Sequence, residues 1–204
     1  MKHVTVLSPG YLSANSQSLL HPLLFNRRLL ADRGVRIKLI TQPSADAYEC
    51  DFLLIDSKFY RADWGASPTL VLDQLGEFSD RIESVLWFHT GDSAGALGKY
   101  VKDILPYVKG LYKSQIYKDK SLYQQPLYGN RLYTDFYNRS MGIADKDPVE
   151  LDPQMSVTEL DKIKVSWNIG YARCFDFLGT YLSAMYKKFP IDVLLAIRPR
   201  IKAA

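Results

Sequence analysis

The stretch Val85-Leu-Trp-Phe-His-Thr-Gly-Asp-Ser-Ala-Gly95 decides the fold class, because an apolar run changes abruptly there into small, polar and ionisable residues. The run 85–88 is typical of a buried β-strand. In open α/β sheets, ligands bind outside the carboxyl ends of the strands. The residues after this strand are therefore candidates for a site: His89, Thr90, Asp92 and Ser93. A second interpretation stays open, since Thr, Asp and Ser are also ordinary helix caps.

On both sides of this stretch, short apolar segments alternate with helical patterns. Strands are predicted at residues 3–7, 35–41, 52–55, 85–88, 111–115 and 162–167. Helices are predicted at about 16–33, 67–82, 97–107 and 175–188. Strands that alternate with helices indicate parallel pairing through right-handed crossovers. We therefore expect an α/β fold, a three-layer α/β/α Rossmann-like domain with a mainly parallel sheet.

Some segments are less regular. Pro22 lies inside the first helical pattern, so we expect that helix to start near the proline or to bend there. Residues 116–139 have a weak pattern with turn signals, and residues 141–159 are predicted to be a polar surface connection. The apolar segment 191–197 fits either a helix or a strand.

Size and composition limit the class of protein. The chain has 204 residues, of which 47% are hydrophobic, so one large domain is expected. No apolar run is long enough to cross a membrane, and no signal peptide is evident. The two cysteines do not suggest a disulfide framework. We expect a cytoplasmic protein without a transmembrane segment, at most peripheral to a membrane.

The net charge of +4 is concentrated in the segment from Tyr107 to Arg139. The same segment contains seven of the fourteen tyrosines. Six basic residues oppose only Asp119 and Asp135 there: Lys109, Lys113, Lys118, Lys120, Arg131 and Arg139. Such interleaving can bind nucleic acid, anionic sugars or phosphates. A solvated basic face with half-buried tyrosines would give the same counts, and both interpretations stay open.

Several functions lose support because their motifs are missing. Only Gly10 follows the first strand, so no glycine-rich dinucleotide-binding loop is present, and the phosphate-binding loop of nucleoside triphosphatases is missing too. Three widely separated histidines without a close cysteine pair do not predict a metal site. No nucleic-acid-binding motif is recognised, and we expect no nucleic-acid partner.

Five strings together resemble one family over Val4 to about Phe189. They are Trp87-Phe-His-Thr-Gly-Asp-Ser-Ala-Gly95, Leu105-Pro-Tyr-Val-Lys109, Lys113-Ser-Gln-Ile-Tyr-Lys-Asp-Lys-Ser-Leu-Tyr123, Tyr128-Gly-Asn-Arg-Leu-Tyr-Thr-Asp135 and Ser166-Trp-Asn-Ile-Gly170. The chain is similar to the N-terminal half of bacterial glycosyltransferase-like proteins of the two-domain GT-B type.

The resemblance implies two Rossmann-like domains that face each other across a cleft. The N-terminal domain mainly holds a carbohydrate acceptor, and the C-terminal nucleotide-binding domain mainly holds the nucleotide-sugar donor. Residues 1–190 would form the acceptor-side domain, and residues 191–204 would begin a linker to a C-terminal domain for which 204 residues leave no room. The implied activity is sugar transfer in surface polysaccharide biosynthesis, with the donor as substrate and no tightly bound cofactor. Transfer is expected only when the chain is paired with a second domain.

An inverting sugar transfer needs a general base beside the acceptor hydroxyl, and Asp92 and His89 are the catalytic candidates. The candidates for substrate binding are Gly10, Asp56, Thr90, Ser93, Lys113, Arg131 and Asn168. If the third and fourth strands are neighbours, Asp56, His89 and Asp92 could face one cleft.

Each candidate also has a structural interpretation. Asp92 would cap a helix that starts near Leu97, His89 would be a hydrogen-bonded histidine, and Asn168 would belong to a turn. Lys113 and Arg131 would pair with Asp119 or Asp135 instead of with a phosphate or an acidic sugar. The alternative function is a non-catalytic α/β module that binds an anionic sugar or a phosphate.

Overall fold

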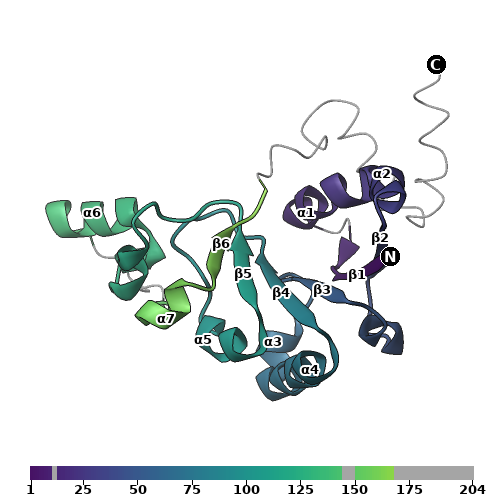
Figure 1. Ribbon diagram of the computed structural model, residues 1–204. Helices are drawn as coiled ribbons and strands as arrows, with labels where there is room; N and C mark the ends of the chain where they lie inside the picture. Colours follow the sequence, from purple (N-terminus) through teal and green to yellow (C-terminus); the bar gives the residue numbers. More distant parts are fainter. Residues whose placement is uncertain (11–12, 144–149, 168–204) are drawn as a thin grey trace.

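The computed structural model describes residues 1–10, 13–143 and 150–167 of the chain (Figure 1). Its centre is a six-stranded sheet in which each neighbouring pair of strands is parallel. The strands are β1 Lys2–Leu7, β2 Val35–Ile40, β3 Phe52–Asp56, β4 Ser84–His89, β5 Gly110–Lys113 and β6 Ile163–Val165. The six predicted strands are confirmed, although β5 and β6 each end two residues earlier than expected.

The strand order is β2-β1-β3-β4-β5-β6, so the chain first moves to one side of β1 and then builds the rest of the sheet on the other side. The connection that follows β1 and the connection that follows β3 therefore run in opposite directions along the sheet. In open α/β sheets, the crevice at such a reversal, outside the carboxyl ends of the strands, is the usual place for a ligand.

Helices cover both faces of the sheet, which confirms the three-layer α/β/α architecture (Figure 1). One face carries α1 Ala14–Phe25 and α2 Arg27–Asp32, and the other carries α3 Asp63–Ala66, α4 Pro68–Arg81 and α5 Val101–Ile104. Successive side chains of a strand point to opposite faces. Accordingly Leu53 and Ile55 belong to the core with α4, while Leu54 belongs to the core with α1.

The interruption expected at Pro22 lies four residues further along the chain. Pro22 is inside α1, and Asn26 separates α1 from α2. The side-chain amide of Asn26 donates a 2.8 Å hydrogen bond to the carbonyl oxygen of Pro22. In a continuous helix that carbonyl would accept the backbone N–H of residue 26, so the side chain competes with the helix.

The helix predicted over residues 97–107 is confirmed only in part, over residues 101–107. The structure has only the short α5 and the 3₁₀ turn η3, Leu105–Tyr107, whereas residues 91–98 form a loop. Gly98 has φ +92°, a left-handed conformation that a helix cannot contain.

Helix α6, Leu132–Met141, lies in the segment where the sequence pattern is weak, and it projects beyond the β6 edge of the sheet (Figure 1). It buries Asp135 and exposes Phe136 and Met141, which are 62% and 65% exposed. Because its apolar residues point outward, no inward apolar stripe marks the helix in the sequence. The remaining short elements are η2 Ala45–Tyr48, η4 Lys120–Gln124, η5 Tyr128–Asn130 and α7 Val157–Leu160.

The predicted helix 175–188, the segment 191–197 and the linker 191–204 lie outside the described residues. In the described part of the chain, no helix is both long enough and apolar enough to cross a membrane.

We expect Leu75→Ala to lower the free energy of unfolding by about 2–5 kcal/mol, because this α4 side chain is fully buried against the sheet. Leu70→Ala is the matched control, since Leu70 lies on the same helix but is 67% exposed. It should change the free energy by less than about 0.5 kcal/mol. Urea unfolding followed by circular dichroism measures both, and equal effects would contradict the packing of α4.

Candidate functional site

The carboxyl ends of β1, β3, β4 and β5 bring the predicted residues to one edge of the sheet. β3 and β4 are neighbours, with Asp56 in register with Phe88, and His89 is in register with Lys113 of β5. The third and fourth strands are thus neighbours, as the prediction of a shared cleft required. Asp56, His89 and Lys113 reach the same edge although up to 57 positions of sequence separate them. Asp56, in register with Phe88, nevertheless lies on the opposite face of the sheet from His89 and Lys113.

Asp56 is fully buried, and hydrogen bonds occupy both of its carboxylate oxygens. Oδ2 accepts the Ser8 hydroxyl at 2.8 Å, while Oδ1 accepts the Thr90 hydroxyl at 2.9 Å and the Lys58 N–H at 3.0 Å. The bonds to Ser8 and Thr90 tie the end of β3 to the ends of β1 and β4. Asp56 and Thr90 therefore have a structural role at the edge, because their hydrogen bonds hold the strand ends together.

His89 and Lys113 form a close pair on the neighbouring strands. The Lys113 ammonium lies 2.7 Å from Nδ1 of His89 and donates a 2.9 Å hydrogen bond to the carbonyl oxygen of Ala96. Lys113 is fully buried, and in the described part of the chain no carboxylate forms an ion pair with it. A buried cation that contacts only neutral acceptors is unusual.

The contacts of His89 determine its tautomer. The backbone N–H of Gly91 also donates to Nδ1, at 3.3 Å, and a backbone N–H can only donate. Nδ1 is therefore the acceptor, and a neutral ring carries its proton on Nε2. Burial, followed by the charges of Lys113 and Lys58, lowers the pKa of His89 to about 3, so the ring is neutral near pH 7.

Burial also lowers the pKa of Lys113 to about 8, although the carboxylates of Asp152 and Asp92 oppose this shift. The amine is still mostly protonated at pH 7. The edge thus combines a buried cation with a neutral imidazole, an arrangement that favours hydrogen-bond donation over proton abstraction by His89.

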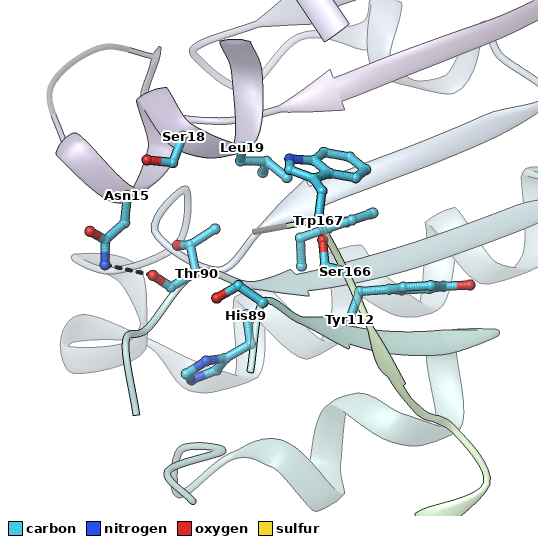
Figure 2. A pocket seen from close by; sticks show the side chains of 10 residues that line it. Asn15, Ser18, Leu19, His89, Thr90, Tyr112, Ser166 and Trp167 are labelled. Atoms are coloured by element: carbon cyan, nitrogen blue, oxygen red, sulfur yellow. Dashed lines mark hydrogen bonds between the residues drawn. The ribbon is translucent and has the colours of Figure 1, made fainter. Parts of the chain in front are cut away.

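Asp92 is exposed and is held by helix α1. The side-chain amide of Asn15 donates to Oδ1 of Asp92 at 2.7 Å and to the carbonyl oxygen of Thr90 at 2.6 Å (Figure 2 draws the second bond). The interpretation of Asp92 as a helix cap is wrong. The helix after it begins at Val101, and its N-cap position is Tyr100, without a side-chain cap.

The loop 91–98, which carries Asp92 and Ser93, is held by residues that were not predicted from the sequence. Oδ2 of Asp152 accepts the N–H groups of Leu97 and Gly98 at 2.6 and 2.9 Å, and the Tyr123 hydroxyl donates to Ala94 O at 2.7 Å. Asp152 lies 55 positions from Leu97 in a polar connection. No local pattern could have indicated this contact.

The other candidates differ in position. Gly10 is buried after β1 with φ +70°, a conformation that suits glycine, and its N–H donates to the Ser8 hydroxyl. Arg131 is exposed before α6 and donates to the Tyr133 hydroxyl at 2.7 Å. Asn168 lies outside the described residues. Because Lys113 is buried and Arg131 is exposed, the two do not form one cationic surface for an anion.

A small cavity opens beside this edge, between the first turns of α1 and the ends of β4, β5 and β6 (Figure 2). Its lining includes Phe88, Tyr112, Ser114, Ser166 and Trp167. Its volume is about 20 Å³, which is room for one water molecule. In Figure 2 the His89 ring points away from Trp167, so His89 contributes main-chain atoms to this side of the edge.

No group of three or more His, Cys, Asp or Glu side chains in the described part of the chain is arranged to hold a metal ion. Asp92 is an exposed carboxylate on a fixed loop, His89 is a neutral donor, and Lys113 is a buried positive charge.

We expect Lys113→Met to raise the pKa of His89 above its value of about 3, because the variant removes a neighbouring positive charge. The value should stay below the ordinary 6.5, since burial is the larger cause. Titration of the His89 ring protons by NMR measures the change. Lys109→Met, at an exposed position before β5, is the control. An unchanged pKa in Lys113→Met would contradict the pairing.

Deprotonation of Lys113 should stabilise the fold. Its pKa is about 8 in the folded chain and 10.5 without burial, so between these values the unfolded chain binds more protons. The free energy of unfolding should therefore rise with pH in this window, by at most about 3 kcal/mol relative to Lys113→Met. Urea unfolding of both proteins at several pH values between 7 and 10 tests this. A difference that does not change with pH would refute it.

No model of a known protein family, no curated protein and no solved structure matches this chain. The candidate site is therefore defined by its own geometry. That geometry consists of an exposed carboxylate on a fixed loop, a neutral histidine over a buried lysine, and a cavity beside them, all at the carboxyl edge of a parallel sheet.

Proposed function

We propose that this chain is the acceptor-side domain of a glycosyltransferase of the GT-B type. It would bind a carbohydrate acceptor at the carboxyl edge of its sheet and take part in sugar transfer from a nucleotide-sugar donor in surface polysaccharide biosynthesis. The observation that carries the proposal is the cluster of Asp92, His89 and Lys113 beside a cavity at this edge, in a Rossmann-like domain.

Two of the sequence strings behind the proposal reach this edge. The string 87–95 supplies the end of β4 and the loop with Asp92, and the string 113–123 begins with the buried Lys113. The two ends of the string 128–135 are joined by a hydrogen bond, in which the Asp135 carboxylate accepts the Tyr128 N–H at 3.0 Å. Strings far apart in the chain thus contribute to the same region.

Asp92 suits the role of general base better than His89. A base must be free to accept a proton from the acceptor hydroxyl. His89 has its Nδ1 occupied by two donors and its pKa lowered to about 3. Asp92 is exposed, and its one side-chain hydrogen bond in the described residues, from Asn15, orients the carboxylate.

Binding of the nucleotide-sugar donor requires a second protein surface that faces this edge. The cavity of about 20 Å³ cannot enclose a nucleotide, whereas small-molecule sites usually measure about 300–1,000 Å³. In a GT-B arrangement the nucleotide-sugar would lie mainly on a C-terminal domain that faces this edge. The described residues would then supply the acceptor surface and the base.

We expect Asp92→Asn to lower kcat for transfer about 100-fold or more, the usual contribution of a general base. The assay uses the chain together with a C-terminal partner domain, a panel of nucleotide sugars and carbohydrate acceptors. Asp73→Asn, on the exposed face of α4, is the matched control and should leave transfer unchanged.

Two outcomes would count against the proposal in different ways. Full activity of Asp92→Asn would remove Asp92 as the base and leave the transferase function standing. The absence of transfer with every donor, acceptor and partner domain would refute the function itself.

A further inference from the structure

The cavity beside the edge has an aromatic side. Phe88 and Tyr112, in register on β4 and β5, stack with their ring centroids 5.0 Å apart, and Trp167 packs on Phe88 at 5.2 Å. Figure 2 shows Tyr112 and Trp167 on the side of the cavity that faces away from Asn15. Flat apolar surfaces of this kind pack well against the C–H face of a sugar ring.

Unpaired hydroxyl groups lie next to these rings. The side chains of Ser114 and Ser166 line the cavity, and neither hydroxyl forms a hydrogen bond with another described residue. The indole Nε1 of Trp167 is buried and has no acceptor within the described part of the chain. A buried donor without a partner is costly, so an acceptor that reached it would gain free energy.

The lining carries no net charge. None of its ten residues is Asp, Glu, Lys or Arg, and its one histidine is neutral near pH 7. A phosphate or a carboxylate would lose its hydration here without meeting a cation, because the buried Lys113 side chain contacts His89 and Ala96 instead. The cavity therefore suits uncharged hydroxyl groups.

We propose that this cavity is a subsite for a neutral sugar, which places one hydroxyl or hydroxymethyl group between Ser114 and Ser166 and rests its ring on Tyr112 and Trp167. The volume of about 20 Å³ matches one such group. The inference rests on the proposed function and narrows its acceptor to an uncharged sugar.

Binding of methyl glycosides tests the subsite without any transfer reaction. Saturation-transfer NMR and calorimetry would compare methyl glucoside, mannoside, galactoside and N-acetylglucosaminide with glucuronate and inorganic phosphate, using the full chain. At least one neutral glycoside should bind, and the two anions should not compete with it. Binding of none of the neutral glycosides, or tighter binding of an anion, would overturn the inference.

Variants then locate the site. Combined Ser114→Ala and Ser166→Ala should weaken the glycoside about tenfold, since two hydrogen bonds are lost. Trp167→Phe keeps an aromatic ring but removes the N–H, and it should weaken binding several-fold. Ser140→Ala on α6 is the control, because it removes a serine hydroxyl that does not line the cavity. Unchanged affinity in the double variant would overturn the subsite.

The two proposals fail separately. A transferase that accepts only acidic sugars, and whose activity is the same in the double serine variant, would refute the subsite alone. A chain that binds neutral glycosides in the cavity, but supports no transfer with any partner domain, would refute the transferase function alone.

Discussion

The carboxyl edge of the sheet depends on the buried carboxylate of Asp56. A buried carboxyl group is stable only when protein groups replace the hydrogen bonds that it made with water. Ser8 from the end of β1, Thr90 from the end of β4 and the N–H of Lys58 supply those hydrogen bonds. Because each donor must reach the same group, the ends of three strands are held at fixed positions. The loop after β4 starts from this anchored point.

The His89–Lys113 pair and the cavity lie on opposite faces of that edge, and the alternation of strand side chains separates them. His89 and Lys113 point to one face, where Lys113 also holds the loop 91–98 through Ala96. Phe88 and Tyr112, one residue earlier on the same two strands, point to the other face and line the cavity. The exposed carboxylate of Asp92 and the uncharged cavity therefore lie close together, and Asn15 belongs to both, since it binds Asp92 and lines the cavity.

The fold was largely predictable because most elements leave a local pattern. Short apolar runs followed by polar residues marked each of the six strands, and Ser67-Pro68 marked the start of α4. The errors have physical reasons. α6 buries Asp135 and exposes Phe136, so its apolar residues do not mark the side of the helix that faces the protein. The loop 91–98 stays non-helical because Gly98 is left-handed and Asp152 binds the N–H groups before α5.

For the candidate site too, some features follow from the local sequence and others only from the tertiary structure. Side-chain type and strand position, which are local properties, were enough to indicate that residues 89–93 follow a strand at the carboxyl edge. The partners of these residues come from contacts over long separations: Asn15 with Asp92, Asp152 with Leu97, and Lys113 with His89. Those contacts, the tautomer of His89 and the cavity depend on strand order and register. They arise only when the sheet is assembled, because periodicity records which face a residue takes and not which residue lies opposite it.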